Sequence, residues 1–154
     1  MTLDACDRLI LNTLQKNARI GLESLAADTG LSVASVQRRV RRLRDDGVIT
    51  AEIAVLNPAK VGQAMTFVVM VELEHERLDQ IETFTRRAEA EPHVQQCYYV
   101  TGGADFCLIC TAQDMEDFEA LTHRLFFESA NVRRFRTSVV MGRKKVGLGV
   151  HIPE

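Results

Sequence analysis

The sequence predicts an α+β protein made of a small helical N-terminal part and a larger C-terminal part that contains a sheet. Three observations predict this. Apolar residues recur at helical spacing up to residue 44, proline and glycine interrupt the chain near residue 60, and apolar residues alternate with a period of two in the segments that follow. The chain has 154 residues, which suffices for one ordinary domain or two small ones.

The first 30 residues contain two predicted helices. Residues 3–17 form the first, and the side chain of Asp4 is suited to cap its start. Its apolar face consists of Cys6, Ile10 and Leu14. Residues 22–29 form a shorter helix that Gly30 ends. A Gly-Leu-Ser turn then leads directly into a third helix, so the second and third helices predict a helix-turn-helix.

The third helix carries five arginines within seven positions, in a chain whose formal net charge is -2. Ser32 can cap its start by accepting a hydrogen bond from the amide of Ser35, and Gly47 suits the left-handed conformation that ends a helix. Its buried stripe consists of Val36, Val40 and Leu43. The helix is therefore apolar behind, cationic in front, and small or polar at its leading end.

This arrangement is typical of a helix that binds the major groove of duplex DNA. Short N-terminal side chains let the backbone approach the bases, and arginines reach guanine edges and phosphates. We expect DNA contacts from Ser32, Ala34, Ser35, Gln37, Arg38, Arg39, Arg41, Arg42 and Arg44. The base contacts would come from Ala34, Ser35 and Arg38, with Gln37 and Arg39 close by, and the phosphate contacts from Arg41, Arg42 and Arg44. The alternative is a basic face that only solvent contacts.

Charge is unevenly distributed along the chain. Residues 1–64 carry nine Lys and Arg against seven Asp and Glu, which gives +2, and the remainder gives -4. The basic helix thus lies on the part that would attract a polyanion. A dimer would present two such helices to an imperfect palindrome. If it neutralised six phosphates, log affinity would fall against log salt with a slope of about -5.

The chain divides into two predicted domains. Residues 48–56 alternate like a strand, which makes the N-terminal domain a winged helix-turn-helix. Proline and glycine in residues 57–62 mark the boundary. We expect a DNA-binding domain over residues 1–56, a linker over 57–65, and an effector-binding and oligomerisation domain over 66–154.

The second domain is predicted to be a ferredoxin-like βαββαβ unit. The four expected strands are residues 66–74, 94–101, 105–112 and 132–143, with a helix after the first and another, capped by Asp114, before the last. Two helices can cover only one face of the sheet, yet Val68, Met70, Cys107 and Ile109 make the other face apolar too. We therefore expect a homodimer through this open sheet face.

The sequence indicates neither a metal site nor a catalytic site. Cys107 and Cys110 would point to opposite faces of one strand, so reduced thiols are expected rather than a chelate. The four histidines lack ligand spacing, and no nucleophile and base stand together. We expect no cofactor. Without a visible signal peptide or a membrane span, we expect a cytoplasmic protein that does not contact a membrane.

Nearly the whole chain resembles the Lrp/AsnC family, the leucine-responsive and asparagine-operon regulators. The matching motifs are Leu3-Asp4, Asp7, Ile10-Leu11, Leu14 through Arg19, Leu25-Ala26, Gly30-Leu31-Ser32, Val36, Arg38-Arg39-Val40, Leu43 and Gly47-Val48-Ile49. In the second half, Thr101 through Phe106 stands where the family has a Gly-x-x-Asp-aromatic turn.

The resemblance implies a transcription regulator that binds DNA as dimers and higher assemblies, such as tetramers or octamers, and responds to a small molecule, usually an amino acid. It places an effector pocket between dimers, lined by Thr101, Gly102, Gly103, Ala104 and Asp105. Glycines let a ligand approach the backbone, free amides could hold its carboxylate, and Asp105 could pair with its ammonium. Alternatively, the two glycines only form a hairpin turn.

The sequence is also compatible with two other functions. Some proteins with the same two-part architecture decarboxylate sirohaem, so the chain could be an enzyme. It could also be an architectural protein that coats or bends DNA without effector control, because the same helix would serve both roles.

Overall fold

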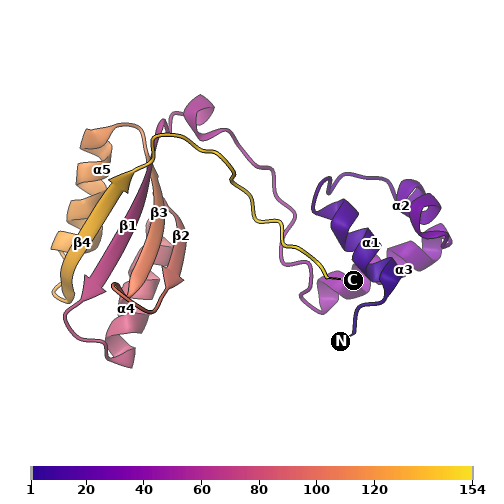
Figure 1. Ribbon diagram of the computed structural model, residues 1–154, viewed down its shortest axis with the longest axis horizontal. Helices are drawn as coiled ribbons and strands as arrows, with labels where there is room; N and C mark the ends of the chain where they lie inside the picture. Colours follow the sequence, from indigo (N-terminus) through magenta and orange to yellow (C-terminus); the bar gives the residue numbers. More distant parts are fainter. Residues whose placement is uncertain (1, 154) are drawn as a thin grey trace. The chain divides into compact units, whose positions relative to one another are not determined.

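The computed structural model describes residues 2–153, which form two compact units (Figure 1). The first unit joins the chain up to Ala54 with the C-terminal residues from Lys145 onward, and the second is Val55–Lys144.

The first unit contains the predicted helix-turn-helix. Its helices are α1 (Ala5–Leu14), α2 (Leu22–Thr29) and α3 (Val33–Asp45). Gly30 adopts φ 70° between α2 and α3, a conformation that only glycine takes at little cost. The three helices bury one apolar core: Ile10, Leu11, Leu25, Ala26, Val36, Val40 and Leu43. The predicted stripe of α3 is thereby confirmed as its buried side.

Capping fixes where the helices of this unit begin and end. The Asp4 side chain accepts a hydrogen bond from the amide of Asp7 at 2.8 Å, and the Asp7 side chain accepts one from the amide of Asp4. Ser32 accepts from the amide of Ser35 at 3.2 Å, as expected. Gly47 takes φ 70° after α3, which confirms the predicted helix end.

The strand predicted over residues 48–56 does not form. The amides of Val48 and Ile49 bond back to the carbonyl of Leu43 and complete the end of α3. Residues 50–57 have neither helix nor strand, and their apolar side chains are exposed, with Val55 at 88%. The prediction was wrong because a segment with period-two alternation forms a strand only beside a neighbouring strand, and within residues 2–153 no strand pairs with it.

The C-terminal residues belong to the first unit, whereas the sequence predicted a second domain that extends over residues 66–154. The side-chain amide of Gln15 accepts from the Val150 amide at 2.6 Å and donates to the Val150 carbonyl at 3.1 Å. Ile152 packs against the helical core of this unit. The side chain of Gln15 therefore bonds both the N–H and the C=O of Val150, as the backbone of a neighbouring strand would.

The second unit has the predicted βαββαβ order. Its elements are β1 (Met65–Leu73), α4 (Leu78–Ala90), β2 (Val94–Tyr99), β3 (Phe106–Ala112), α5 (Met115–Thr122) with a π-helical extension over His123–Phe127, and β4 (Val132–Val139). The strands are antiparallel in the order β2-β3-β1-β4. A short 3-10 helix, Pro58–Val61, precedes β1.

Both helices of the second unit cover the same face of the sheet and lie behind it in Figure 1. That face supplies the core, and alternate residues of β1 and β3 are fully buried in it. On the other face Val68, Met70, Cys107 and Ile109 are only half-buried. The open face thus has the apolar centre that the sequence predicted.

Candidate DNA-binding and effector sites

The exposed side of α3 is the candidate DNA-binding surface. Ala34, Gln37, Arg38, Arg41, Arg42 and Arg44 are exposed, whereas Ser35 and Arg39 are half-buried. The hydroxyl oxygen of Ser32 is engaged in the helix cap. A shallow hollow of about 230 Å³ opens on this side, lined by Ser35, Arg38, Arg39 and Arg42. Its lining is polar and cationic, which suits an anionic group such as a phosphate.

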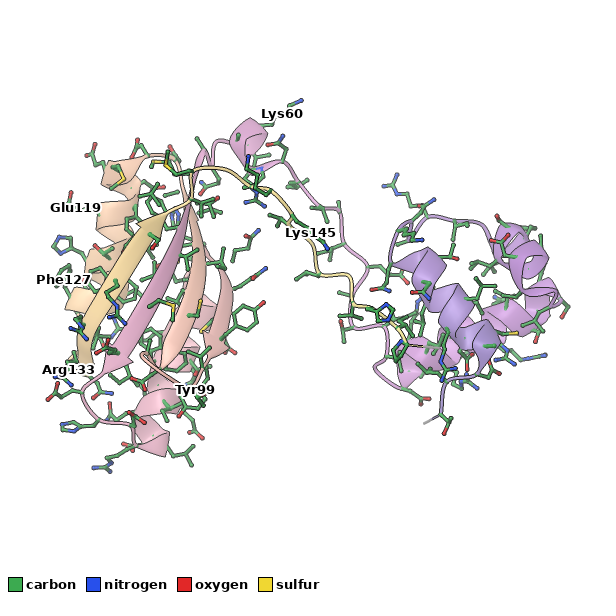
Figure 2. The ribbon with its side chains drawn as sticks, viewed as in Figure 1. Lys60, Tyr99, Glu119, Phe127, Arg133 and Lys145 are labelled. Carbon is green, nitrogen blue, oxygen red and sulfur yellow. The ribbon has the colours of Figure 1, made fainter. Side chains whose placement is uncertain are left out.

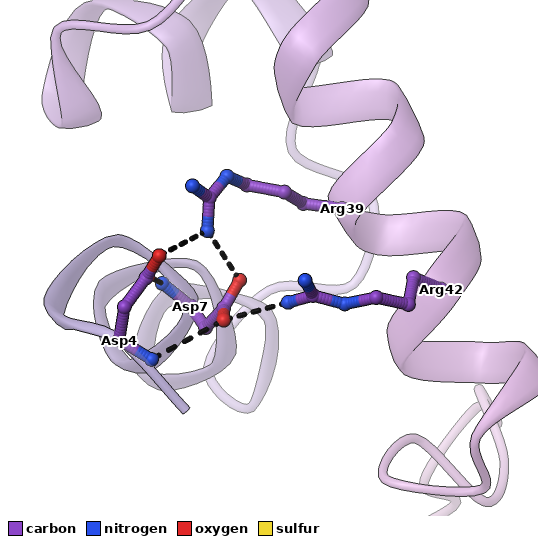
Figure 3. Close-up of polar contacts among 4 residues, drawn as sticks. All are labelled: Asp4, Asp7, Arg39 and Arg42. Atoms are coloured by element: carbon purple, nitrogen blue, oxygen red, sulfur yellow. Dashed lines mark hydrogen bonds and ion pairs between the residues drawn. The ribbon is translucent and has the colours of Figure 1, made fainter. Parts of the chain in front are cut away.

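Two of the five arginines are bound to carboxylates of α1 and its cap (Figure 3). Nη1 of Arg39 lies 2.6 Å from Oδ2 of Asp4 and 2.8 Å from Oδ1 of Asp7. Nη2 of Arg42 lies 2.7 Å from Oδ2 of Asp7. Asp7 is the centre of this cluster, because its side chain is only 1% exposed and each of its oxygens bonds a different guanidinium.

The charges of this cluster stabilise one another. The hydrogen bond from the Asp7 amide, followed by that from Arg39, holds the pKa of the Asp4 carboxyl below its ordinary value. The hydrogen bonds to Asp4 and then to Asp7 raise the pKa of Arg39. Both guanidinium groups of the cluster are therefore held toward α1, which restricts where they can meet DNA.

The other three arginines of α3 are more exposed. Arg44 bonds Glu52 with its Nη2 atom at 2.6 Å, and Arg41 lies 3.8 Å from Asp45 one turn away. Within residues 2–153, Arg38 has no ion-pair partner. Sequence reasoning found the cationic face but missed which arginines are paired. The clue was present in Asp4 and Asp7, which stand three apart at the start of α1.

The predicted effector turn lies between β2 and β3. The amide of Val100 donates to the Asp105 carbonyl at 2.8 Å and closes the loop. Gly102 adopts φ 114°, which favours glycine. Thr101, Gly102 and Gly103 are exposed, whereas Ala104 is buried. The exposed part of the turn therefore offers mostly backbone.

Asp105 has a structural role at this turn. Its Oδ2 atom accepts a hydrogen bond from the Leu73 amide at 2.6 Å, where a register shift interrupts the pairing of β1 with β4. Its own amide donates to the Val71 carbonyl at 2.9 Å. The carboxylate thus satisfies a strand amide that the irregular pairing leaves without a backbone partner.

Sequence reasoning missed an arginine beside this turn. Nη2 of Arg136, on β4, donates to the Gly103 carbonyl at 3.0 Å and lies 3.3 Å from Oε1 of Glu72. Arg134 bonds the same carboxylate at 2.8 Å. The hydrogen bond from Arg134 lowers the pKa of Glu72 despite some opposing desolvation. The clue in the sequence was that Arg134 and Arg136 are two positions apart, which places both side chains on one face of β4. Their neighbour Arg133 is labelled in Figure 2.

Other reactive groups do not form a site. Across residues 2–153, no three His, Cys, Asp or Glu side chains are grouped so that they could hold a metal ion. Cys107 is half-buried and Cys110 fully buried, and burial raises the pKa of the Cys110 thiol to about 12. Among the described helices, none combines the length and apolarity needed to span a bilayer.

A helix-turn-helix with a basic second helix, followed by a ferredoxin-like unit, defines the class of two-part DNA-binding regulators. Comparison with known proteins agrees. Residues 3–50 match the model for winged helix-turn-helix DNA-binding domains, and residues 66–149 match the Lrp/AsnC ligand binding domain. The chain belongs to the Lrp/AsnC family of transcriptional regulators.

Individual relatives cover almost the whole chain. An uncharacterized HTH-type transcriptional regulator of Sinorhizobium fredii is 45% identical over 99% of this chain and 90% of its own length. The leucine-responsive regulatory protein of Rhizobium meliloti is 33% identical, covering 97% and 96%. Among solved structures, a Neisseria meningitidis regulator in complex with L-Met has a TM-score of 0.90 at 27% identity and covers 97% of each chain.

Proposed function

We propose that the exposed side of α3 binds the major groove of duplex DNA and that a small molecule, an amino acid, regulates this binding through the second unit. The observation that carries the proposal is the surface around Ser35 and Arg38. It joins a short side chain near the start of α3 with an arginine that has no ion-pair partner in residues 2–153, beside a cationic hollow. Such a protein would act in the cytoplasm, where bacterial DNA lies.

The arginines of α3 have different proposed roles. Arg38 and Ser35 contact base edges, because Ser35 lies in the first turn of α3, Arg38 lies about one turn further on, and both line the hollow. Arg41 and Arg44 contact phosphates, since their carboxylate partners are exposed and are readily exchanged for phosphate. Arg39 and Arg42 contact DNA from fixed positions, because the Asp7 carboxylate binds both side chains.

The proposed effector binds at the turn from Thr101 to Asp105. The exposed glycine backbone can approach the carboxylate and ammonium groups that every amino acid carries. The relative from Neisseria meningitidis, solved with L-Met, supports an amino acid as the class of effector. The effector would favour one assembly over another, with a typical coupling of about 1–3 kcal/mol.

The proposed dimer forms through the open sheet face. Its half-buried centre of Val68, Met70, Cys107 and Ile109 is an apolar surface of the kind that a second copy covers in a two-fold interface. Replacing Ile109 with Asp should convert the dimer into monomers in sedimentation experiments. A dimer that persisted would place the interface elsewhere.

Selection of duplexes from a random pool tests the DNA-binding proposal. The wild-type chain should enrich an imperfect palindrome, and it should bind the selected duplex more tightly than a scrambled one. Equal affinity for both would favour the architectural alternative. The absence of binding to any duplex in dilute salt would refute the proposal.

The relatives are named as regulators, which favours regulation over catalysis. Titration of the purified protein with sirohaem tests the enzymatic alternative, because a decarboxylase of this architecture would bind the tetrapyrrole and change its absorbance spectrum. A thermal-shift screen against the twenty amino acids identifies the effector.

A further inference from the structure

Asp7 is a buried carboxylate that binds two arginines of the candidate DNA-binding helix. Its side chain is 1% exposed, and within residues 2–153 no other acidic residue is buried. Oδ1 bonds Arg39 at 2.8 Å and Oδ2 bonds Arg42 at 2.7 Å. Figure 3 shows both side chains reaching from α3 toward the start of α1.

These contacts fix the direction of the two guanidinium groups. A buried carboxylate that loses its partners is strongly destabilising, so the folded unit favours the conformations in which both arginines reach it. The planar guanidinium is also held in one orientation, unlike an ammonium group. The hollow beside Ser35 and Arg38 is therefore lined by Arg39 and Arg42 in defined positions.

From this geometry we infer that Asp7 is a specificity-determining residue for DNA binding. The inference rests on the DNA binding proposed above. Contacts from arginine to phosphate add affinity without sequence information, because every duplex presents the same backbone. Asp7 holds Arg39 and Arg42 against α1. The two arginines therefore cannot move to bind phosphates irrespective of the base sequence of the duplex. The difference in affinity between the right and the wrong sequence then depends on Arg38 and its neighbours.

The replacement Asp7→Asn tests this directly, because asparagine keeps the size of the side chain and removes its charge. Released arginines should bind phosphates freely, so affinity for a scrambled duplex should rise. The ratio of affinities for the selected and scrambled duplexes should fall by about tenfold or more, because the added phosphate contacts need no particular sequence. Two released arginines in each protomer should also steepen the salt slope of a dimer by about 2 to 4.

Asp46→Asn is the matched control. Asp46 is exposed, follows α3 directly, and has no ion-pair partner in the part of the chain that the structure describes. This replacement changes the net charge by the same amount on the same unit. It should raise affinity for both duplexes alike and leave their ratio unchanged. A loss of ratio in both variants would show that net charge alone matters and would overturn the inference.

A second variant covers the case in which Asp7→Asn does not fold, which circular dichroism and a thermal melt would reveal. Replacing both Arg39 and Arg42 with lysine keeps the charges and a partner for Asp7, yet it removes the fixed guanidinium geometry. The affinity ratio should fall here as well. If it stays within about twofold of wild type in either folded variant, Asp7 has only a structural role and the inference is wrong.

Failure of the inference and failure of the proposed function give different results. If the wild-type chain binds no duplex, the proposed function fails and the inference fails with it. If the wild-type chain distinguishes the two duplexes and folded Asp7→Asn does so equally well, only the inference fails.

Discussion

Arginines cluster in two regions of this molecule, on α3 and on β4, and the two clusters differ in their partners. On α3, Arg39 and Arg42 bind Asp7, whose side chain is 1% exposed. On β4, Arg134 and Arg136 bind Glu72, whose side chain is 17% exposed. The comparison shows that the number of arginines in a segment overestimates how many of them are unpaired, because their carboxylate partners lie in distant parts of the sequence.

The clusters also differ in how much their ion pairs should contribute to stability. Water contacts Glu72 and its arginines, so it screens their attraction and can replace a lost partner. Asp7 has almost no contact with water, and a guanidinium left without it would lose a strong charge-assisted hydrogen bond. The shortest distance to each of these two carboxylates is similar, 2.7 Å to Asp7 from Arg42 and 2.8 Å to Glu72 from Arg134, but the two contacts should differ in energy.

The largest effect on stability should come from replacing Asp7 with alanine. This change leaves two guanidinium groups without their buried partner and removes half of the capping box of α1. The free energy of unfolding of the first unit should fall by about 3 kcal/mol, because two charge-assisted hydrogen bonds and a capping contact are lost. Urea denaturation followed by circular dichroism measures it. A loss below about 1 kcal/mol would show that the two clusters are energetically alike.

The next largest effect should come from Arg38→Ala. Affinity for the selected duplex should fall by about 1–3 kcal/mol, with a smaller loss for the scrambled duplex, because a base contact is removed. Arg134→Ala, on β4, is the control and should leave both affinities unchanged. Fluorescence anisotropy measures them. Equal losses for Arg38→Ala on both duplexes would mean that Arg38 contacts only phosphate.

Variants of Asp105 and Arg136 should test effector binding at this turn without disturbing the fold. Asp105→Ala would also remove the acceptor of the Leu73 amide, whereas Asp105→Asn keeps an oxygen there and removes the charge. Asp105→Asn should therefore abolish the thermal shift caused by the effector and change DNA affinity little. Arg136→Gln should weaken the effector response by loosening Gly103. An unchanged response in both variants would move the effector pocket away from this turn.

The ion pair between Glu91 and Arg124 should make the stability of the second unit depend on pH. Burial alone raises the pKa of the Glu91 carboxyl, but the hydrogen bonds from Arg124 and the His93 amide outweigh it, so the pKa lies below its ordinary 4.5. A pKa that is lower in the folded than in the unfolded state adds stability above 4.5, and this stability is lost as pH falls through the folded value. Glu91→Gln should therefore lose less stability than wild type between about pH 6 and pH 3. Identical pH profiles would contradict the pairing.

The smallest effect should come from Glu72→Gln. Its partners Arg134 and Arg136 are more than half exposed and can be solvated when the charge is lost. The melting temperature should stay close to that of wild type and well above that of Asp7→Ala. A decrease similar to that of Asp7→Ala would show that the β4 cluster is also essential to folding.

Local chemistry made much of the fold predictable. The caps at Asp4, Ser32 and Asp114 follow from side chains that bond amides three residues away, and Gly47 from backbone sterics. The order of strands and helices followed from the change between helical and period-two alternation. The family resemblance added the class of function, which the comparisons confirmed.

Long-range contacts were not predictable in the same way. Asp7 and Arg42 are 35 positions apart, and Gln15 and Val150 are 135 apart, so no local pattern reveals either contact. The strand expected over residues 48–56 failed for a related reason, since its alternation could not show whether a partner strand exists. At the effector turn, the role of Asp105 in ligand binding stays a prediction, and the hydrogen bond that its carboxylate accepts from the amide of Leu73, 32 positions away, had no local signal.

The most direct test of this account is the salt dependence of DNA binding by the wild-type chain. Anisotropy titrations of a selected duplex between about 50 and 300 mM salt should give a straight line of log affinity against log salt. We expect a slope of about -5 or shallower for a dimer, because Asp7 restrains two arginines in each protomer. An affinity that does not change with salt concentration, or no binding to any duplex at the lowest salt concentration, would contradict the claim that α3 contacts DNA.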